Sequence, residues 1–454
     1  MSKKSAYLGG EAESSEEENN SDSNSNSNSN SSSYDSSDSS DDEMAFLEHK
    51  MFDRAYLLMK LFLRLLKHLV FTTPKWVIMA TRLFMFVICL LPGFVRFFWY
   101  YMVSGGVRRD IRYGPASRQV LDVYLPAPSE KNNNNKDIPI VVFVTGGAWI
   151  IGYKMWGALL GRALTSNNCM LVIPDYRNFP QATGEEMCED VDVAVQWVLR
   201  NVGTGTRRSE FSDVGSNKKV VLVGQSAGAQ LTALVLLKKA MQSVQKREVQ
   251  SSKSSKPRYQ RPPNPRTLRR WSPGEIRGFI PISGPYDLVS IKDFMHQKGL
   301  DKKIISHIFP DLIGASPVHV CDEIREQMNV CSLKSINSRW DFPPTCVIHG
   351  SEDQTVPHEM CGRFSGKLRD IGVESEAIIY EGWSHTDGIL EGPMEGDHRL
   401  HRDIFDRVIF WTEGGRDEGK DIRDNKHSFD DKCRLCKPLS PSCMIQIGRS
   451  VNPF

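Results

Sequence analysis

The sequence has little of what marks a small secreted protein. Its ten cysteines in 454 residues show no regular spacing, which excludes a dense disulfide scaffold and fits reduced thiols in a protein facing the cytosol. We expect no cleavable secretory signal, because the N-terminal residues are polar and acidic. Charge of neither sign dominates, since 57 Lys and Arg nearly balance 55 Asp and Glu. The length suffices for one large α/β domain with appendages.

Apolar residues are almost absent from the first 43 positions. Residues 11–43 are nearly all Ser, Asn, Asp and Glu, and residues 1–43 hold 11 acidic residues and 2 lysines. Such a stretch cannot offset the entropy of ordering by burying apolar surface. It predicts a disordered acidic tail over residues 1–43.

Two apolar segments follow within residues 44–104. In residues 55–71, Lys60, Arg64 and Lys67 form one basic stripe at helical spacing, which favours a helix on an anionic membrane surface over one packed on a domain. In residues 76–103 the uncharged centre is shorter than the ~20 residues of a full span and is followed by Arg96. A kinked span, a re-entrant hairpin and a deep interfacial helix all stay open. We expect residues 44–104 to be a membrane-associated or transmembrane helical region.

Residues 105–413 alternate between strand-like and helix-like patterns. The β-branched runs lie at 138–147, 168–177, 219–228, 276–284, 343–353 and 375–382, with amphipathic segments such as 185–202 between them. This alternation predicts an α/β domain whose central sheet is mostly parallel and has helices on both faces.

Two segments depart from this alternation. Residues 243–272 carry nine Lys and Arg with one Glu and are rich in Ser and Pro, which predicts a disordered surface insertion. Contact with anionic lipid or plain solvation is favoured over nucleic acid, because no folded binding module surrounds it. Residues 414–454 are expected to be a polar C-terminal tail, in which Cys433 and Cys436 form a lone pair without a second pair at zinc spacing.

A candidate nucleophile lies in Gly224-Gln225-Ser226-Ala227-Gly228. The pattern alone is weak, but here it follows a β-branched strand and begins an apolar helix, as a nucleophile elbow requires. The small neighbours leave room for a sharp turn that exposes the Ser226 hydroxyl. The sequence therefore predicts Ser226 as the nucleophile rather than part of an ordinary turn.

A serine nucleophile needs a base and an orienting carboxylate. Asp353 and His385 follow Ser226 in the order expected, and both lie in loops after late strands. Glu352 is an alternative carboxylate. The alternative bases, ranked below His385, are His349, His358 and His398.

Oxyanion donors are expected in the loop after an early strand. In Val144-Thr145-Gly146-Gly147-Ala148-Trp149, the glycines let backbone N–H groups turn toward a developing charge, together with the N–H of Ala227. Related esterases have a His-Gly-Gly-Gly loop at this place, and Thr145 stands where that histidine would be.

The Ser226 segment, Asp353, His385 and the loop at Gly146 lie within a longer resemblance. Roughly residues 107–412 resemble the plant isoprenylcysteine α-carbonyl methylesterase family, in the carboxylesterase branch of the α/β-hydrolase fold. The resemblance is carried by VTGGAWIIGYKMWGALLGRAL, DYRNFPQA, GQSAGAQ, HGSED and GWSHTDGILEGP, and the ending SVNPF is similar too. The basic insertion and Trp383-Ser384 depart from the family pattern. The resemblance implies an α/β-hydrolase fold with the triad Ser226, Asp353 and His385. It implies substrate contacts by Gly146, Gly147, Ala148, Gln225, Ser226 and Ala227.

The function expected from the resemblance is hydrolysis of the methyl ester on a C-terminal prenylated cysteine, without cofactor or metal. Prenylcysteine methyl esters and prenylated proteins would be the substrates, with no nucleic-acid partner. The family's location implies endoplasmic reticulum and Golgi membranes, with the catalytic domain facing the cytosol. A membrane-bound esterase of broader lipid or xenobiotic esters is the first alternative. A non-catalytic hydrolase-fold receptor for a small apolar ligand is the second.

The prenyl chain needs an apolar surface beside the oxyanion loop. Trp149, Tyr153 and Trp156 follow Gly147 directly and are the candidates for that surface. Ile150 and Ile151 are at least as well explained by packing against the sheet.

Overall fold

The computed structural model describes residues 56, 59–60, 75–127, 137–205, 209–252, 271–297, 302–330, 341–413, 429–430 and 436–453. The chain divides into two compact units, Met1–Phe71 and Thr72–Phe454. The acidic tail expected over residues 1–43 and nearly all of the basic-striped segment 55–71 lie outside the described residues.

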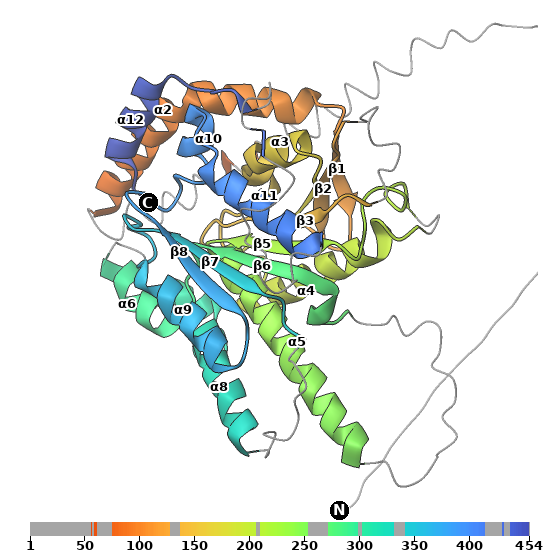
Figure 1. Cartoon of the computed structure of the whole chain (residues 1–454). Helices are drawn as coiled ribbons and strands as arrows, with labels where there is room; N and C mark the ends of the chain where they lie inside the picture. Colours follow the sequence, from red (N-terminus) through yellow and green to blue (C-terminus); the bar gives the residue numbers. More distant parts are fainter. Residues whose placement is uncertain are drawn as a thin grey trace, which may run out of the picture. The chain divides into compact units, whose positions relative to one another are not determined.

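The centre of the second unit is an eight-stranded sheet with the order β1-β2-β4-β3-β5-β6-β7-β8 (Figure 1). Strands β1 and β2 form an antiparallel edge, and from β4 onward all neighbours are parallel. The strands are β1 (Val107–Arg112), β2 (Val120–Tyr124), β3 (Ile140–Val144), β4 (Met170–Pro174), β5 (Val220–Gln225), β6 (Ile276–Ile282), β7 (Thr345–Gly350) and β8 (Ser375–Tyr380).

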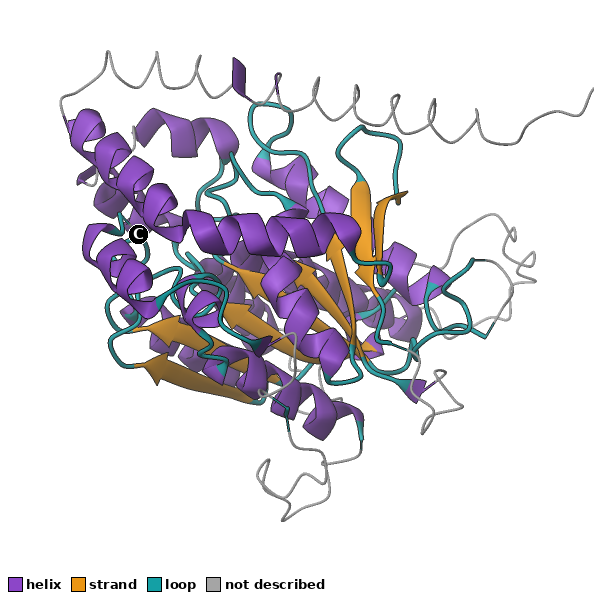
Figure 2. Cartoon of the chain, turned by 90° about the horizontal axis from the view of Figure 1, so that it is seen from above, coloured by secondary structure: helices purple, strands orange, loops and turns teal. Residues whose placement is uncertain are grey.

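Helices cover both faces of the sheet (Figure 2). One face packs against α4 (Gly184–Asn201), α5 (Ala227–Ser252), α8 (Pro317–Val330) and α9 (Glu359–Asp370), with α6 (Leu288–Gln297) and α7 (Lys302–Ile308) beside them. The other face packs against α2 (Lys75–Val103), η2 (Lys154–Gly157), α3 (Ala158–Ser166), α10 (Glu391–Glu395), α11 (Arg399–Thr412) and α12 (Ser442–Val451). The short η3 (Pro273–Glu275) precedes β6.

The inner strands are buried on both sides, which explains why their sequences read as continuous apolar runs. Every residue of β3, β4 and β5 is buried. Helix α4 begins where Thr183 and Glu186 form a capping box, and its apolar stripe faces the sheet. The predicted fold class, a mostly parallel sheet with helices on both faces, is confirmed.

The basic insertion is shorter than the sequence predicted. Helix α5 continues to Ser252, and Trp271 is already part of the folded domain. The Trp271 indole donates a 2.6 Å hydrogen bond to Asp192 and lies 4.5 Å under the ammonium of Lys239. The intervening residues 253–270 lie outside the described part.

The C-terminal segment also differs from the expected polar tail. Residues Ser442–Val451 form α12, which packs against α2, and Gly448 lets the two helices approach closely because a Cβ there would lie 2.7 Å from Leu90. The many charged residues in 414–435 led to the prediction of a polar tail, so the amphipathic helix after them was not predicted. Cys433 lies outside the described residues.

Helix α2 packs against the rest of the second unit along its inner side. Phe86, Leu90, Phe97 and Tyr101 are buried, and the Tyr101 hydroxyl donates to Asp122 on β2 at 2.7 Å. Its outer side is apolar as well. In the described part of the chain, α2 contains the one helical stretch, Ala80–Val103, that is long and apolar enough to cross a membrane.

Candidate active site

Ser226 lies in the sharp turn between β5 and α5. Its φ is +52°, in the left-handed region that side chains rarely adopt. The flanking glycines make the turn sterically feasible: a Cβ at Gly224 would lie 2.7 Å from the Ala229 Cα, and one at Gly228 would lie 2.2 Å from the Val144 carbonyl oxygen. The strand, turn and helix predicted around Ser226 are all present.

The structure brings Ser226, His385 and Asp353 together at the carboxyl edge of the sheet. His385 Nε2 lies 2.8 Å from Ser226 Oγ, and His385 Nδ1 lies 2.6 Å from Asp353 Oδ2. The three side chains come from the loops after β5, β7 and β8, and each is only 7–8% exposed. This is the geometry in which an imidazole removes a hydroxyl proton while a carboxylate holds its other nitrogen.

Asp353 is held as a carboxylate. Its Oδ1 accepts the backbone N–H groups of Thr355 and Val356 at 2.8 and 2.9 Å. Burial alone would raise the pKa of Asp353, but the charge of His385 and the hydrogen bonds from both histidines outweigh it and keep the pKa well below its usual range. The second histidine is His349, whose Nε2 lies 3.0 Å from Asp353 Oδ2.

The alternative residues do not meet the nucleophile. His349 contacts Asp353 and the Val356 carbonyl oxygen. Glu352 is exposed, and His358 lies beside Glu359 at the surface. His398 pairs with His401 on the α11 side of the sheet, at an Nδ1–Nδ1 distance of 3.0 Å.

In the candidate oxyanion loop, one of the expected backbone donors already has a partner. The Gly146 N–H is already bound to Gln225 Oε1 at 3.1 Å, so it does not face an incoming substrate. Gln225 therefore supports the loop. Among the described residues no acceptor is bonded to the N–H groups of Gly147, Ala148 or Ala227. Gly147 has a φ of +128°, and a Cβ there would lie 2.3 Å from the Gly152 nitrogen, so glycine is required.

The three aromatic residues expected to line a prenyl site divide into different environments. Trp149 is fully buried, packs edge-on against Phe309 and donates to Gln230 Oε1 at 3.0 Å. Trp149 therefore holds the loop from inside the core and has no exposed surface on which a prenyl chain could bind. Trp156 is half-buried, and its ring meets that of Phe94 on α2 edge-on at 6.2 Å. Tyr153, also half-buried, precedes η2.

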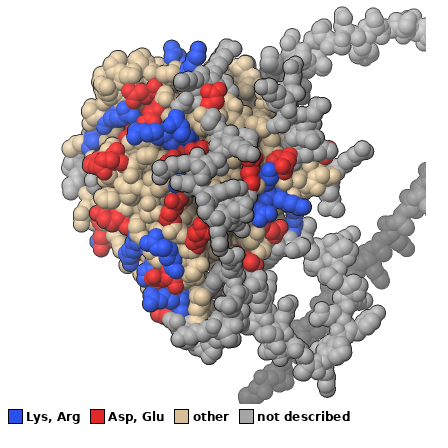
Figure 3. Space-filling view, in the orientation of Figure 1, with Lys and Arg blue, Asp and Glu red and all other residues tan. Residues whose placement is uncertain are grey.

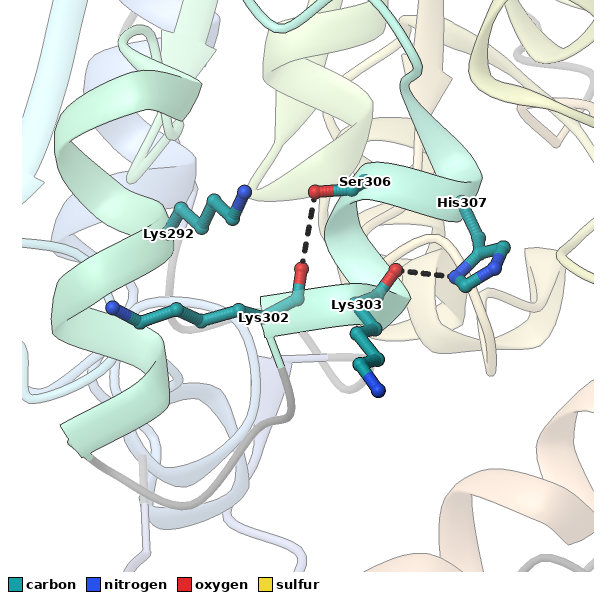
Figure 4. A pocket seen from close by; sticks show the side chains of 5 residues that line it. All are labelled: Lys292, Lys302, Lys303, Ser306 and His307. Carbon is teal, nitrogen blue, oxygen red and sulfur yellow. Dashed lines mark hydrogen bonds between the residues drawn. The ribbon is translucent and has the colours of Figure 1, made fainter.

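One small cavity in the described part is lined by His385 itself together with residues from β6, β7 and the loop after β8, including Trp383 and Ser384. A further pocket is a surface depression between α6 and α7, formed by Lys292, Lys302, Lys303, Ser306 and His307 (Figure 4). It contains none of the predicted site residues.

The visible surface has no broad field of one charge. Lys and Arg side chains are interspersed with Asp and Glu over the described face in Figure 3. Within the described ranges, no group of three or more His, Cys, Asp and Glu side chains is arranged to hold a metal ion.

Comparison with known proteins gives consistent matches. The family model described as BD-FAE matches residues 121–368. An isoprenylcysteine alpha-carbonyl methylesterase of Arabidopsis thaliana is 30% identical over 399 residues, which cover 88% of this chain and 82% of the relative. A probable isoprenylcysteine alpha-carbonyl methylesterase of Oryza sativa subsp. japonica is 31% identical over 73% of this chain and 70% of its own length. The crystal structure of esterase B from Lactobacillus rhamnosis aligns with a TM-score of 0.50 at 13% identity, covering 74% of this chain and 96% of that one, and supports the fold alone.

The fold and these relatives define a carboxylic ester hydrolase of the α/β-hydrolase class. Within that class, the chain belongs to the isoprenylcysteine alpha-carbonyl methylesterase family.

Proposed function

We propose that the protein hydrolyses the carboxyl methyl ester of C-terminal isoprenylcysteine, with Ser226, His385 and Asp353 as its catalytic residues. The observation that carries this proposal is the continuous hydrogen-bonded chain from Ser226 through His385 to Asp353. The names of the curated relatives from Arabidopsis thaliana and Oryza sativa support the substrate class.

In the first half-reaction, Ser226 Oγ attacks the ester carbonyl carbon while His385 Nε2 accepts the hydroxyl proton. Asp353 stabilises the imidazolium that forms. The oxyanion of the tetrahedral intermediate accepts hydrogen bonds from the N–H groups of Gly147 and Ala227, with Ala148 next to them. His385 then returns the proton to the leaving methoxide, and methanol departs from an acyl-enzyme on Ser226.

In the second half-reaction, water replaces methanol. His385 removes a proton from this water as its oxygen attacks the acyl carbon. Collapse of the second tetrahedral intermediate breaks the bond to Ser226 Oγ, and His385 reprotonates the serine. The products are a free prenylcysteine carboxylate and methanol, and the steps require no cofactor.

Turnover of farnesylcysteine methyl ester beside a short-chain aryl ester tests the substrate. We expect a clearly higher kcat/KM for the prenylated ester, because its long apolar chain adds binding surface. Hydrolysis of the aryl ester alone would establish the broader esterase instead. No turnover of either ester, together with ligand binding, would establish the non-catalytic receptor.

We further propose that the protein is attached to the cytosolic side of endoplasmic reticulum and Golgi membranes, with α2 lying in the plane of one leaflet. Ten of the eighteen large hydrophobic side chains exposed in the described part lie on α2. They include Phe84, Leu91, Val95 and Trp99, each at least 50% exposed. So large an exposed apolar surface is typical of a membrane or protein contact.

A spanning orientation of α2 conflicts with its inner contacts. The buried positions run from Phe86 to Tyr101, which is roughly 22 Å of helix at ~1.5 Å per residue. Helix α12 packs beside this part of α2, and its Arg449 forms an ion pair with Glu395. If α2 crossed the membrane, this ion pair would enter the hydrocarbon core. An in-plane helix keeps these groups in water.

Labels at positions 84 and 99 of the full chain distinguish the two orientations. Quenching by lipids brominated at graded acyl depths should report the same shallow depth for both labels. Depths that differ by about 20 Å would establish a span. Absence of quenching at both positions would show that another protein surface covers α2.

A further inference from the structure

The loop that carries His385 is held by residues far away in the sequence. Asn452, which follows α12 and is 5% exposed, donates from Nδ2 to Glu391 Oε1 at 2.6 Å. The same nitrogen lies 3.1 Å from both Ser384 Oγ and Thr386 Oγ1, the hydroxyls on either side of His385. One amide group thus contacts both neighbours of the candidate base.

A second contact comes from the last turn of α12. Arg449 Nε donates to Asp387 Oδ1 at 2.7 Å, while Asp387 Oδ2 accepts the backbone N–H of Ser384 at 3.0 Å. Ser384, Thr386 and Asp387 are therefore all tied to residues 449–452, either directly or through one side chain. His385 between them is left to face Ser226 and Asp353.

Glu391 completes this arrangement from inside. Its Oε1 accepts hydrogen bonds from Thr386 Oγ1 at 2.8 Å and from Asn452 Nδ2. The Glu391 side chain is fully buried, and within the described structure its Oε2 has no hydrogen-bond partner. Burial, reinforced by the charge of Asp387, raises the pKa of Glu391 to about 8, so the carboxyl is mainly neutral near pH 7.

Asn452 is itself fixed by α2. Arg82 donates from its guanidinium to the Asn452 carbonyl oxygen at 2.6 Å and lies 3.4 Å from the Val451 carbonyl oxygen. A guanidinium with two carbonyl acceptors fixes the direction of the backbone as well as its distance. The amide side chain of Asn452 is consequently aimed at the loop.

We propose that Asn452 is a positioning residue for the reaction, which holds the loop Ser384–Asp387 so that His385 stays aligned between Ser226 and Asp353. The proposal rests on the catalytic role of His385 proposed above. A base that moves by about 1 Å costs up to roughly 100-fold in rate, because proton transfer depends steeply on alignment. Asn452 touches no substrate and acts through the loop.

The test is Asn452→Ala in the full chain, assayed on the short aryl ester. We expect kcat to fall roughly 10- to 100-fold with KM changed less than about twofold, since the oxyanion loop is untouched. Labelling of Ser226 by a fluorophosphonate should slow in parallel, because it needs the same base. Ser450→Ala is the matched control, because among the described residues the Ser450 hydroxyl donates only to the Ile447 carbonyl oxygen within α12.

Three further variants make the test specific. Thr386→Val removes one hydroxyl of the network without a change in size and should lower kcat several-fold. Glu391→Gln keeps an acceptor oxygen, so its kcat should fall less than that of Glu391→Ala. If Asn452→Ala does not fold, unchanged kcat in Thr386→Val overturns the proposal. Unchanged kcat in folded Asn452→Ala, or equal loss in Ser450→Ala, overturns it too.

Failure of the substrate proposal remains distinguishable. If wild-type protein cleaves only the aryl ester, the isoprenylcysteine function is wrong, while the Asn452 comparison on that ester still decides the positioning role. If Ser226→Ala keeps full aryl-ester turnover, the triad itself is wrong.

Discussion

The edge of the sheet that holds Ser226 and the outer side of α2 contrast in how they interact with their surroundings. At the sheet edge, three polar side chains are buried and joined by directional hydrogen bonds of 2.6 and 2.8 Å. On α2 the exposed side chains are large and apolar. Their free energy of binding to a membrane depends on the apolar area that they bury. Substitutions at the Ser226 edge should therefore change the rate of ester hydrolysis steeply. Substitutions on the outer side of α2 should weaken membrane binding in proportion to the apolar surface removed.

The largest expected effect comes from Ser226→Ala. Loss of the nucleophile should lower turnover by roughly 10⁴- to 10⁶-fold, while binding to lipid vesicles stays unchanged because α2 is intact. Ester hydrolysis and vesicle flotation on the same preparation measure both quantities. A variant that keeps its turnover would remove Ser226 from the mechanism.

Next in size is Asp353→Asn. The amide cannot stabilise the His385 imidazolium, so kcat should fall on the order of 10³- to 10⁴-fold, whereas Glu352→Gln should stay within about twofold. Steady-state hydrolysis of the aryl ester compares the two neighbours. A reversed order of effects would make Glu352 the carboxylate of the triad.

On α2, the double variant Leu91→Ser with Val95→Ser should weaken vesicle binding by roughly 30-fold or more, because both side chains are at least 50% exposed. Turnover of the aryl ester should not change. Val193→Ser with Val289→Ser, at exposed valines elsewhere on the domain, is the control and should bind vesicles normally. Equal loss in the control would show that binding is not specific to α2.

Trp156→Ala changes a half-buried side chain of η2 that contacts Phe94 on α2. We expect kcat/KM for farnesylcysteine methyl ester to fall roughly tenfold more than that for the aryl ester, because an apolar contact with the chain is lost. Parallel assays of both esters measure the ratio. An equal decrease for both would place the prenyl contact elsewhere.

The smallest effect concerns pH and Glu391. The Glu391 pKa of about 8 in the folded protein exceeds the ordinary glutamate value of 4.5, so the folded state binds the proton more tightly. This contribution to stability is fully present below pH 4.5 and is lost as pH rises through 8. The free energy of unfolding of wild type should therefore fall between pH 5 and 9 relative to Glu391→Gln, by about 1 kcal/mol or more. Denaturant titrations of both proteins at pH 5 and pH 9 measure the difference. The same change in the free energy of unfolding with pH in wild type and Glu391→Gln would show that Glu391 stays ionised.

Local sequence patterns predicted the turn around Ser226 and the strands beside it, whereas contacts between distant segments could not be inferred from the sequence. The strand before Ser226, its flanking glycines and the order of Asp353 and His385 follow from short-range steric and chemical requirements. The bond between Gln225 and Gly146 depends on two loops meeting across 79 positions, and Trp149 points into the core because of its left-handed backbone at φ +61°. Neither feature has a periodic or spacing signal.

The C-terminal segment shows the same limit more strongly. The segment with Arg449 and Asn452 was expected to be part of a polar tail, because the partners of the Asn452 side chain lie 61 to 68 positions earlier in the sequence. The similarity of SVNPF to the family's ending was the one available signal. A tag or deletion at this end would test its importance indirectly, but Asn452→Ala isolates the contact.

The apolar outer side of α2 also has a consequence for handling the protein. In water without lipid, its exposed side chains form a surface that a detergent micelle or another copy would cover. The apparent size in gel filtration should then vary with detergent concentration, and a dimer seen at low detergent would reflect colloidal association through this helix. Assembly is therefore best measured in lipid nanodiscs, where the bilayer competes for the same surface.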